Sequence, residues 1–162
     1  KRLPLSPPTV FRYASSTAVF YGGEMTLRGR LSEHVSATIQ PVYLWGRETE
    51  LEEPALGISP FSVDGTVRLE PAGGDYFLQS SVHAVTEQDR VAGLRGETPT
   101  DGYVTVDVKA GWTFWERIAV NGGVTNLLDA HYVNHLNAKN PYSGMPIPEP
   151  GRVFFVDLRV RL

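Results

Sequence analysis

The chain repeats one pattern along most of its length: apolar and polar residues alternate with a period of two. The pattern is most regular from residue 104 to residue 114, where Val104, Val106 and Val108 alternate with Thr105 and Asp107. Successive side chains of a β-strand point to opposite faces, so each such run predicts a strand with one apolar and one polar face. The seven predicted strands cover residues 19–31, 35–45, 61–69, 76–87, 104–114, 118–125 and 154–162.

No segment shows the periodicity of a helix, and the predicted fold class is therefore all-β. Pro41 falls inside the second predicted strand. Because proline has no N–H to donate to a neighbouring strand, we expect a bulge at this position.

The connections between the predicted strands alternate between short and long. Short turns surround "LSEH", "PAGG" and "WER", whereas the long connections are "GRETELEEPALGISP", "QDRVAGLRGETPTDG" and residues 126–150. In an antiparallel up-and-down sheet this order places every long loop at one end, as in bacterial outer-membrane barrels. The strands of about ten residues are also long enough to cross a bilayer when tilted.

The apolar face of the predicted strands fits contact with lipid. Within the strands this face carries no Lys, Arg, Asp or Glu. Aromatic residues lie mostly toward the strand ends, where interfacial girdles would be. They are Tyr21, Tyr43, Trp45, Tyr76, Trp112, Phe114 and Phe154. Alternation alone fits a soluble sandwich equally well, but these features together favour a transmembrane antiparallel β-barrel.

Composition excludes several other classes of function. The net charge is -3 and the basic residues are not clustered, which argues against nucleic acid as a partner. The absence of cysteine excludes disulfides and thiolate metal sites. No Gly-x-Ser-x-Gly elbow or phosphate-binding glycine loop is present, so we predict neither an enzyme nor a cofactor. The sequence begins at Lys1 without a signal peptide, and we expect a mature protein or a piece of a longer one.

The last part of the chain carries a set of motifs. The stretch "GGVTNLLDAHYVNHLNAKNPYSGMPIPEPGRVFFVDLRVRL" resembles the C-terminus of TonB-dependent outer-membrane receptors, where Gly-x-x-Asn-Leu-x-Asp-x-x-Tyr leads into a long loop, then Pro-Gly-Arg and the closing strand. The matching residues, which we interpret as structural, are Gly123, Asn126, Leu127, Asp129, Tyr132, Pro150, Gly151 and Arg152. Upstream, "FYGGEMTLRGRL" and "ETPTDGYVTVDVKAGW" resemble the family's Gly-x-Glu and Thr-x-Gly-Tyr strands.

The resemblance implies a fold and a function. Members of the family have a 22-stranded barrel closed by an N-terminal plug, so residues 1–162 would be the C-terminal portion of the barrel, with about seven strands and no plug domain. The implied function is uptake of a scarce ligand such as a siderophore, a metal ion or a metal chelate across the Gram-negative outer membrane. The implied partners are outer-membrane lipid, TonB acting through the missing N-terminal part, the cargo and the barrel assembly machinery.

Two histidines in the last long connection are candidate ligand contacts. His131 and His135 are four residues apart, with Asp129 just before them. A helix would place both imidazoles on one face, but the segment leaves a strand and enters a loop, so we predict no metal site. We interpret both as solvated loop residues and keep contact with cargo as the alternative, because imidazole is a common metal ligand. The acidic run at residues 48–54 is likewise expected to be a solvated loop, with a cation-attracting patch as the alternative.

Two alternatives to the receptor remain open. A small complete barrel with a structural or adhesive role would need an eighth strand from Thr9 to Ser15. A soluble β-sandwich binding module would bury the apolar face in its core. In a barrel, Asp107 and Asp157 share the polar face with Lys109, Arg159 and Arg161, and we expect an ordinary polar network there.

Overall fold

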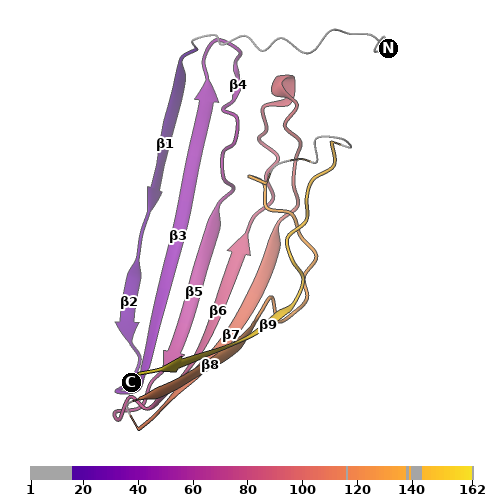
Figure 1. The fold of residues 1–162 in the computed structure, drawn as a ribbon. Helices are drawn as coiled ribbons and strands as arrows, with labels where there is room; N and C mark the ends of the chain where they lie inside the picture. Colours follow the sequence, from indigo (N-terminus) through magenta and orange to yellow (C-terminus); the bar gives the residue numbers. More distant parts are fainter. Residues whose placement is uncertain (1–15, 116, 138, 140–143, 162) are drawn as a thin grey trace.

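The computed structural model describes residues 16–115, 117–137, 139 and 144–161. The strands are β1 (Ala18–Glu24), β2 (Leu27–Arg30), β3 (Val35–Glu48), β4 (Glu53–Pro54), β5 (Ser62–Leu69), β6 (Tyr76–Val85), β7 (Tyr103–Phe114), β8 (Ile118–Thr125) and β9 (Val153–Val160). They form one antiparallel sheet with the strand order β1-β3-β5-β6-β7-β8-β9, in which β2 and β4 also pair with β3 (Figure 1). The one helical element in the described ranges is a 3-10 turn, η1 (Gly93–Arg95), in the loop between β6 and β7. The all-β prediction is confirmed.

Each of the seven predicted strands is present, and the first of them is split in two. β1 and β2 both pair with β3 in a single unbroken register, with Glu24 opposite Val42 and Leu27 opposite Ile39. The break faces Pro41. Its carbonyl accepts a hydrogen bond from the N–H of Met25 at 3.2 Å, but proline has no N–H to return the bond. The predicted bulge at Pro41 is therefore wrong, because the missing donor interrupts the neighbouring strand without shifting the register.

The strand register gathers the apolar positions of all the strands on one face of the sheet. Paired residues in neighbouring strands point to the same side. Apolar pairs on one side include Leu69 with Leu78 and Val82 with Val106, and the same side extends across the sheet to Val124 with Phe154. We call this side the apolar face and the opposite side the polar face.

Nothing among the described residues covers the apolar face. Phe154 is 71% exposed and Val156 is 81% exposed. The buried hydrophobic residues in the described ranges are Ala55, Ile58 and Ala92, all of which lie in the loops. A soluble β-sandwich would need a second sheet against this face, and the structure has a single sheet. The described residues therefore form an open sheet whose apolar face is uncovered.

Aromatic side chains gather near both ends of the strands on the apolar face. Tyr21 stacks on Trp45 with ring centroids 4.3 Å apart, near the start of β1 and the end of β3. At the opposite end Trp112 contacts Tyr76 at 5.4 Å and Phe114 at 5.6 Å. Two bands separated along the strands are the arrangement of interfacial girdles, and the prediction of aromatic residues at the strand ends is confirmed.

The polar face carries hydrogen bonds across neighbouring strands. His83 Nδ1 lies 2.7 Å from Asp64 Oδ1, and the hydroxyls of Thr66 and Ser81 are 3.0 Å apart. Arg68 also forms an ion pair with Glu70, two residues further along the same chain segment, at 2.8 Å. These pairs place polar groups in rows along the sheet.

Three phenylalanines also lie on the polar face, each opposite a glycine. Phe20 faces Gly46, Phe77 faces Gly111 and Phe155 faces Gly123 in the strand register. A Cβ atom on any of the three glycines would overlap the facing phenylalanine ring. The ring therefore covers the backbone where a glycine leaves space, which is a known way of stabilising glycine in a sheet.

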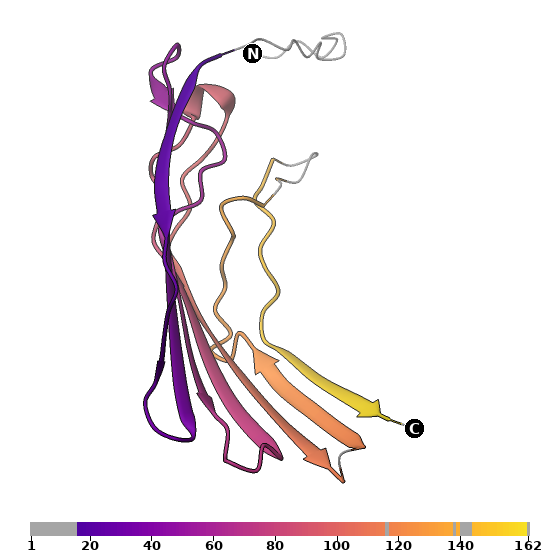
Figure 2. The same cartoon turned by 90° about the vertical axis from the view of Figure 1, so that its left-hand side faces the viewer.

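The sheet is curved, and the long loops all leave from one end of it (Figure 2). The loop after β8 stands on the concave side, where Tyr132 stacks on Tyr103 of the polar face with centroids 4.1 Å apart. The polar face is thus the concave one. In the described part of the chain β1 and β9 are not paired, so the sheet does not close. The eighth strand that a small barrel would require, at residues 9–15, lies outside the described residues.

The described residues hold one short 3-10 turn as their helical element. No helix in the described part of the chain has the length and apolar character needed to cross a membrane.

Candidate functional site

The motif after β8 folds around Asn126. This residue is 4% exposed and has a left-handed backbone with φ of 49°. Its side-chain carbonyl accepts a hydrogen bond from the N–H of Ala130 at 2.8 Å, and its amide donates to the carbonyls of Ala130 at 2.8 Å and Pro150 at 3.4 Å. Asparagine tolerates this backbone conformation and supplies both a donor and an acceptor, which explains why the turn uses it.

Asp129 joins the two ends of the same loop. One of its carboxylate oxygens accepts a hydrogen bond from the N–H of Arg152 at 2.8 Å. A Cβ atom added to Gly151 would lie 2.8 Å from that oxygen, so a larger residue there would displace the Asp129 carboxylate. Burial raises the pKa of Tyr132, whose ring packs on Tyr103. Asn126, Asp129 and Tyr132 thus lie at the base of the loop, and the structural role of the whole motif stays a prediction.

His131 and His135 lie in an irregular loop and point to different surroundings. His135 has a side chain that is 2% exposed. Its Nδ1 lies 3.0 Å from the hydroxyl of Thr100, and its Nε2 lies 3.1 Å from a carboxylate oxygen of Glu97. A neutral imidazole with its proton on Nε2 satisfies both contacts. The interpretation of His135 as a solvated residue is therefore wrong, and the side chain bridges two loops. His131 is exposed and lines a cavity between two long loops.

Glu97 is the point where three loops meet. Its carboxylate accepts hydrogen bonds from the backbone N–H groups of Gly57 at 2.8 Å and Ala92 at 2.6 Å, and it contacts His135. Burial by itself would raise the pKa of Glu97, but the two N–H donors and the imidazole outweigh it and hold the pKa below its ordinary value. The charged form of this carboxylate therefore stabilises the contacts among the three loops, which we call the loop package.

Arg95 fixes the acidic run at residues 48–54 to the same package. Its guanidinium forms ion pairs with Glu48 at 2.7 Å and Glu53 at 2.9 Å, and donates to the carbonyl of Pro54 at 3.2 Å. Both glutamates are buried. The expectation of a solvated acidic loop is therefore wrong for these two residues. Sequence reasoning missed Arg95 and Glu97, because no spacing links them to partners about 40 residues away.

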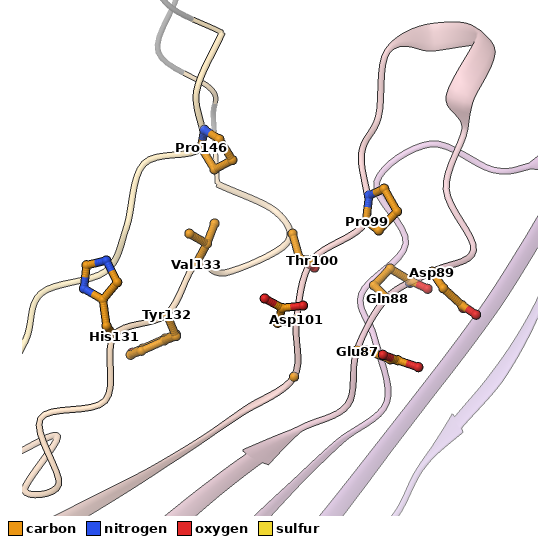
Figure 3. Close-up of a pocket in the computed structure, with 11 residues that line it drawn as sticks. Glu87, Gln88, Asp89, Pro99, Thr100, Asp101, His131, Tyr132, Val133 and Pro146 are labelled. Carbon is orange, nitrogen blue, oxygen red and sulfur yellow. The ribbon is translucent and has the colours of Figure 1, made fainter.

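A cavity of about 340 Å³ lies between the loop at residues 86–102 and the loop at residues 126–152 (Figure 3). His131 and Tyr132 lie on one side, and Glu87, Gln88 and Asp89 on the other. It is lined by Glu87, Gln88, Asp89, Pro99, Thr100, Asp101, Gly102, His131, Tyr132, Val133 and Pro146. The volume is at the lower end of the range for small-molecule sites.

The chemistry of this cavity is acidic and polar. Glu87, Asp89 and Asp101 carry carboxylates and His131 adds an imidazole. Together they favour a positively charged ligand over an anionic one. Within the described ranges no three His, Cys, Asp or Glu side chains are close enough to hold a metal ion directly.

The two carboxylates of the polar network expected on the polar face accept hydrogen bonds from backbone and amide groups. Asp107 accepts a hydrogen bond from the N–H of Asn126 at 2.8 Å, and Asp157 accepts one from the amide of Asn121 at 3.2 Å. Neither carboxylate forms an ion pair with a described lysine or arginine within 4.0 Å. Asp107 instead holds the loop base to β7.

Comparisons of sequence gave no relatives. No model of a known protein family matches the chain, and no curated protein matches it.

Comparison with solved structures gave many matches to outer-membrane receptors. The copper transporter OprC superposes with a TM-score of 0.82 and 22% sequence identity, covering 90% of this chain and 24% of that one. The ferric yersiniabactin uptake receptor FyuA from Yersinia pestis has a TM-score of 0.70 and 19% identity, covering 88% of this chain and 23% of that one. A mutant of the ferric enterobactin receptor PfeA from Pseudomonas aeruginosa has a TM-score of 0.69 and 20% identity, covering 88% and 22%.

The chain spans about a quarter of the length of these structures, and nearly the whole of it takes part in the match. At this level of identity the likeness concerns the fold. The apolar strand face, the short turns and the long loops that the sequence predicts all agree with this fold. The fold of this chain is that of a segment of a TonB-dependent outer-membrane receptor barrel.

Proposed function

We propose that the chain is the C-terminal portion of the barrel of a Gram-negative outer-membrane receptor, which takes up a scarce ligand with energy passed on by TonB. One observation carries the proposal. The curved sheet turns an uncovered apolar face outward and a polar face inward, and the same sheet superposes over 90% of the chain on a copper transporter. The C-terminal placement rests on the motif from Gly123 to Arg152 and on the closing strand that follows it.

The cavity between the two long loops is the proposed point of contact with cargo. Its carboxylates and His131 suit a positively charged cargo such as a metal bound in a cationic chelate, and the matched structures include a copper transporter and receptors for ferric siderophores. His131 is proposed to touch the cargo. His135 is proposed to act indirectly, because it is enclosed by Thr100 and Glu97 and holds the loops that shape the cavity.

The proposal assigns transport and no catalytic step to the protein. TonB would act through the N-terminal part of the receptor that lies outside these 162 residues. The barrel assembly machinery and outer-membrane lipid would be its further partners.

The test uses the full-length receptor in cells from which its gene has been deleted. Restoring the gene should return the protein to the outer-membrane fraction and restore uptake of radioactive iron chelates or of radioactive copper. Deleting tonB should abolish that uptake while the amount of receptor stays the same. Recovery of the protein in the soluble fraction, or uptake of every tested metal without any dependence on the receptor, would refute the proposal.

A further inference from the structure

β3 continues to Glu48, beyond its predicted end at residue 45, and the extension brings an arginine onto the apolar face. Arg47 follows Trp45 on that face and pairs with Val19 of β1. A strand rises by about 3.3 Å per residue, so Arg47 lies about 7 Å beyond Trp45 toward the long loops. Arg47 is therefore at the outer margin of the aromatic band that Tyr21 and Trp45 form.

A second arginine reaches the same band from another loop at this end of the sheet (Figure 2). Arg90, in the loop after β6, has its guanidinium carbon 4.8 Å from the centroid of the Trp45 ring. A cation over an aromatic ring is attracted by the negative face of the ring. Arg47 and Arg90 thus lie beside the same tryptophan, although one belongs to a strand and the other to a distant loop. We call these two residues the arginine pair.

No carboxylate in the described part of the chain neutralises the arginine pair. Both residues are exposed, and neither forms an ion pair within 4.0 Å with a described residue. The acidic residues next to them in the chain have other roles. Glu48 pairs with Arg95, and Asp89 lines the cavity between the two long loops. Because like charges that lie close together repel each other, an anion beside the arginine pair would be stabilised.

The position of the arginine pair favours a lipid as the source of that anion. In the proposed receptor the apolar face contacts lipid, and Trp and Tyr side chains at its ends lie level with the lipid headgroups. Charged groups just beyond such a band lie level with lipid phosphates. Guanidinium groups bind phosphate through two parallel hydrogen bonds, whereas an ammonium group binds as a point charge. An acidic soluble protein would meet the same charges but would gain nothing from the apolar surface beside them.

We propose that Arg47 and Arg90 bind the phosphate of an anionic lipid headgroup, and that this contact restrains the loop that carries Arg90. The cavity proposed for cargo is lined in part by the residues directly before Arg90, which are Glu87, Gln88 and Asp89. A bound headgroup therefore restrains the backbone beside the cavity. The proposal rests on the proposed function, since it needs the apolar face to contact lipid.

The test measures binding of phosphatidylglycerol to the full-length receptor, purified in a neutral detergent and weighed intact by native mass spectrometry. An arginine beside anionic lipid contributes roughly fivefold to affinity, so the variant Arg47→Gln, Arg90→Gln should bind the first lipid roughly 30-fold more weakly. The control Arg28→Gln, Arg30→Gln removes two charges from the polar face and should bind like the wild type. Binding that is equal in the two variants would refute the proposal.

Two further comparisons separate a lipid site from simpler explanations. The variant Arg47→Lys, Arg90→Lys keeps both charges but loses the paired hydrogen bonds, and its affinity should lie between those of the wild type and the glutamine variant. This variant also keeps the proposal testable if the glutamine variant fails to fold, because wild-type affinity in it would refute the paired hydrogen bonds. Displacement of the lipid by an equal concentration of inorganic phosphate would identify a site for free phosphate and would refute the lipid.

Hydrogen exchange tests the effect on the loop. The full-length receptor in phosphatidylcholine nanodiscs is compared with the same receptor in nanodiscs that also contain phosphatidylglycerol. The peptide that covers residues 86–92 should exchange more slowly with phosphatidylglycerol in the wild type, and at equal rates in the glutamine variant. Equal rates in the wild type would overturn the proposed restraint on the loop. Wild-type receptor that fails to reach the outer membrane of cells would count against the proposed function instead.

Discussion

The two faces of β3 give a direct test of the structure, because Ile39 and Gln40 are neighbours in the chain and point to opposite sides. Ile39 lies on the apolar face, level with Leu27 on one side and Gly65 on the other, and is 45% exposed. Gln40 lies on the polar face, where its amide donates to the hydroxyl of Thr26 at 3.2 Å and Asp64 stands opposite. The variants Ile39→Arg and Gln40→Arg therefore add the same side chain to the same strand, but on opposite faces.

The expected costs differ because the surroundings differ. An arginine that faces lipid near the bilayer midplane costs about 2–4 kcal/mol, which is roughly a 30- to 900-fold change in the folding equilibrium. Ile39→Arg should approach that range. Gln40→Arg should change the free energy of unfolding by less than about 1 kcal/mol, because its guanidinium remains in a polar space beside Asp64.

The assay is equilibrium folding of the full-length receptor into lipid vesicles, titrated with urea. The folded form is identified by its altered mobility on a gel when the sample is not boiled. Equal losses in the two variants would mean that β3 has no lipid-facing side. A larger loss in Gln40→Arg would mean that the two faces are assigned the wrong way round.

Three further predictions concern the loops and the glycines. His135→Ala should destabilise the loop package by about 1–3 kcal/mol, because it removes a buried partner from Glu97. Limited proteolysis should therefore cut the loops of this variant faster. His131→Ala should leave the cleavage rate unchanged and weaken uptake. The pKa of Glu97 is lowered by folding, so its contribution is complete above the unfolded value of 4.5 and is lost as the pH falls through the folded value. An acid-stable protease should therefore cut the wild-type loops faster on acidification, and Glu97→Gln should abolish most of that change. Gly111→Ala should destabilise the barrel by about 1–3 kcal/mol in the urea titration, because the new methyl overlaps Asn121 Oδ1 and the ring of Phe77. A smaller residue at position 77 should recover part of the loss.

The strands and their faces could be predicted from the sequence because alternation is a local property. A side chain two residues along returns to the same face, so the pattern from Val104 to Phe114 assigns both faces of β7 without any knowledge of its neighbours. The register then agrees across the sheet, because a shift by one residue would expose polar groups on the apolar face.

Burial within the polar face could not be predicted in the same way. Thr105 belongs to that face by alternation, and the structure agrees, since it pairs with His83. It is nevertheless only 8% exposed. Alternation gives the side of the sheet to which a residue points, but the fraction of it that neighbours cover depends on contacts distant in sequence.

The candidate site also combines features that the sequence could predict with features that it could not. The turn at Asn126 and Asp129 was predictable, because these residue types favour left-handed turns and bond to nearby backbone. The burial of His135 was not, since it depends on Thr100 and Glu97, which lie more than 30 residues earlier in the chain. Loop packing of this kind has no periodic signature.

The orientation of the sheet in the membrane underlies every proposal made for this chain, and the absence of cysteine from these 162 residues makes it measurable. Single cysteines are introduced at Leu94, which is 77% exposed in a long loop, and at Ser32, in the short turn before β3. Intact cells that produce the full-length receptor are treated with a maleimide that does not cross the outer membrane. We predict labelling at position 94 in intact cells, and labelling at position 32 only after the outer membrane is opened. Labelling at position 32 in intact cells, or at neither position until the cells are broken, would contradict the proposed orientation.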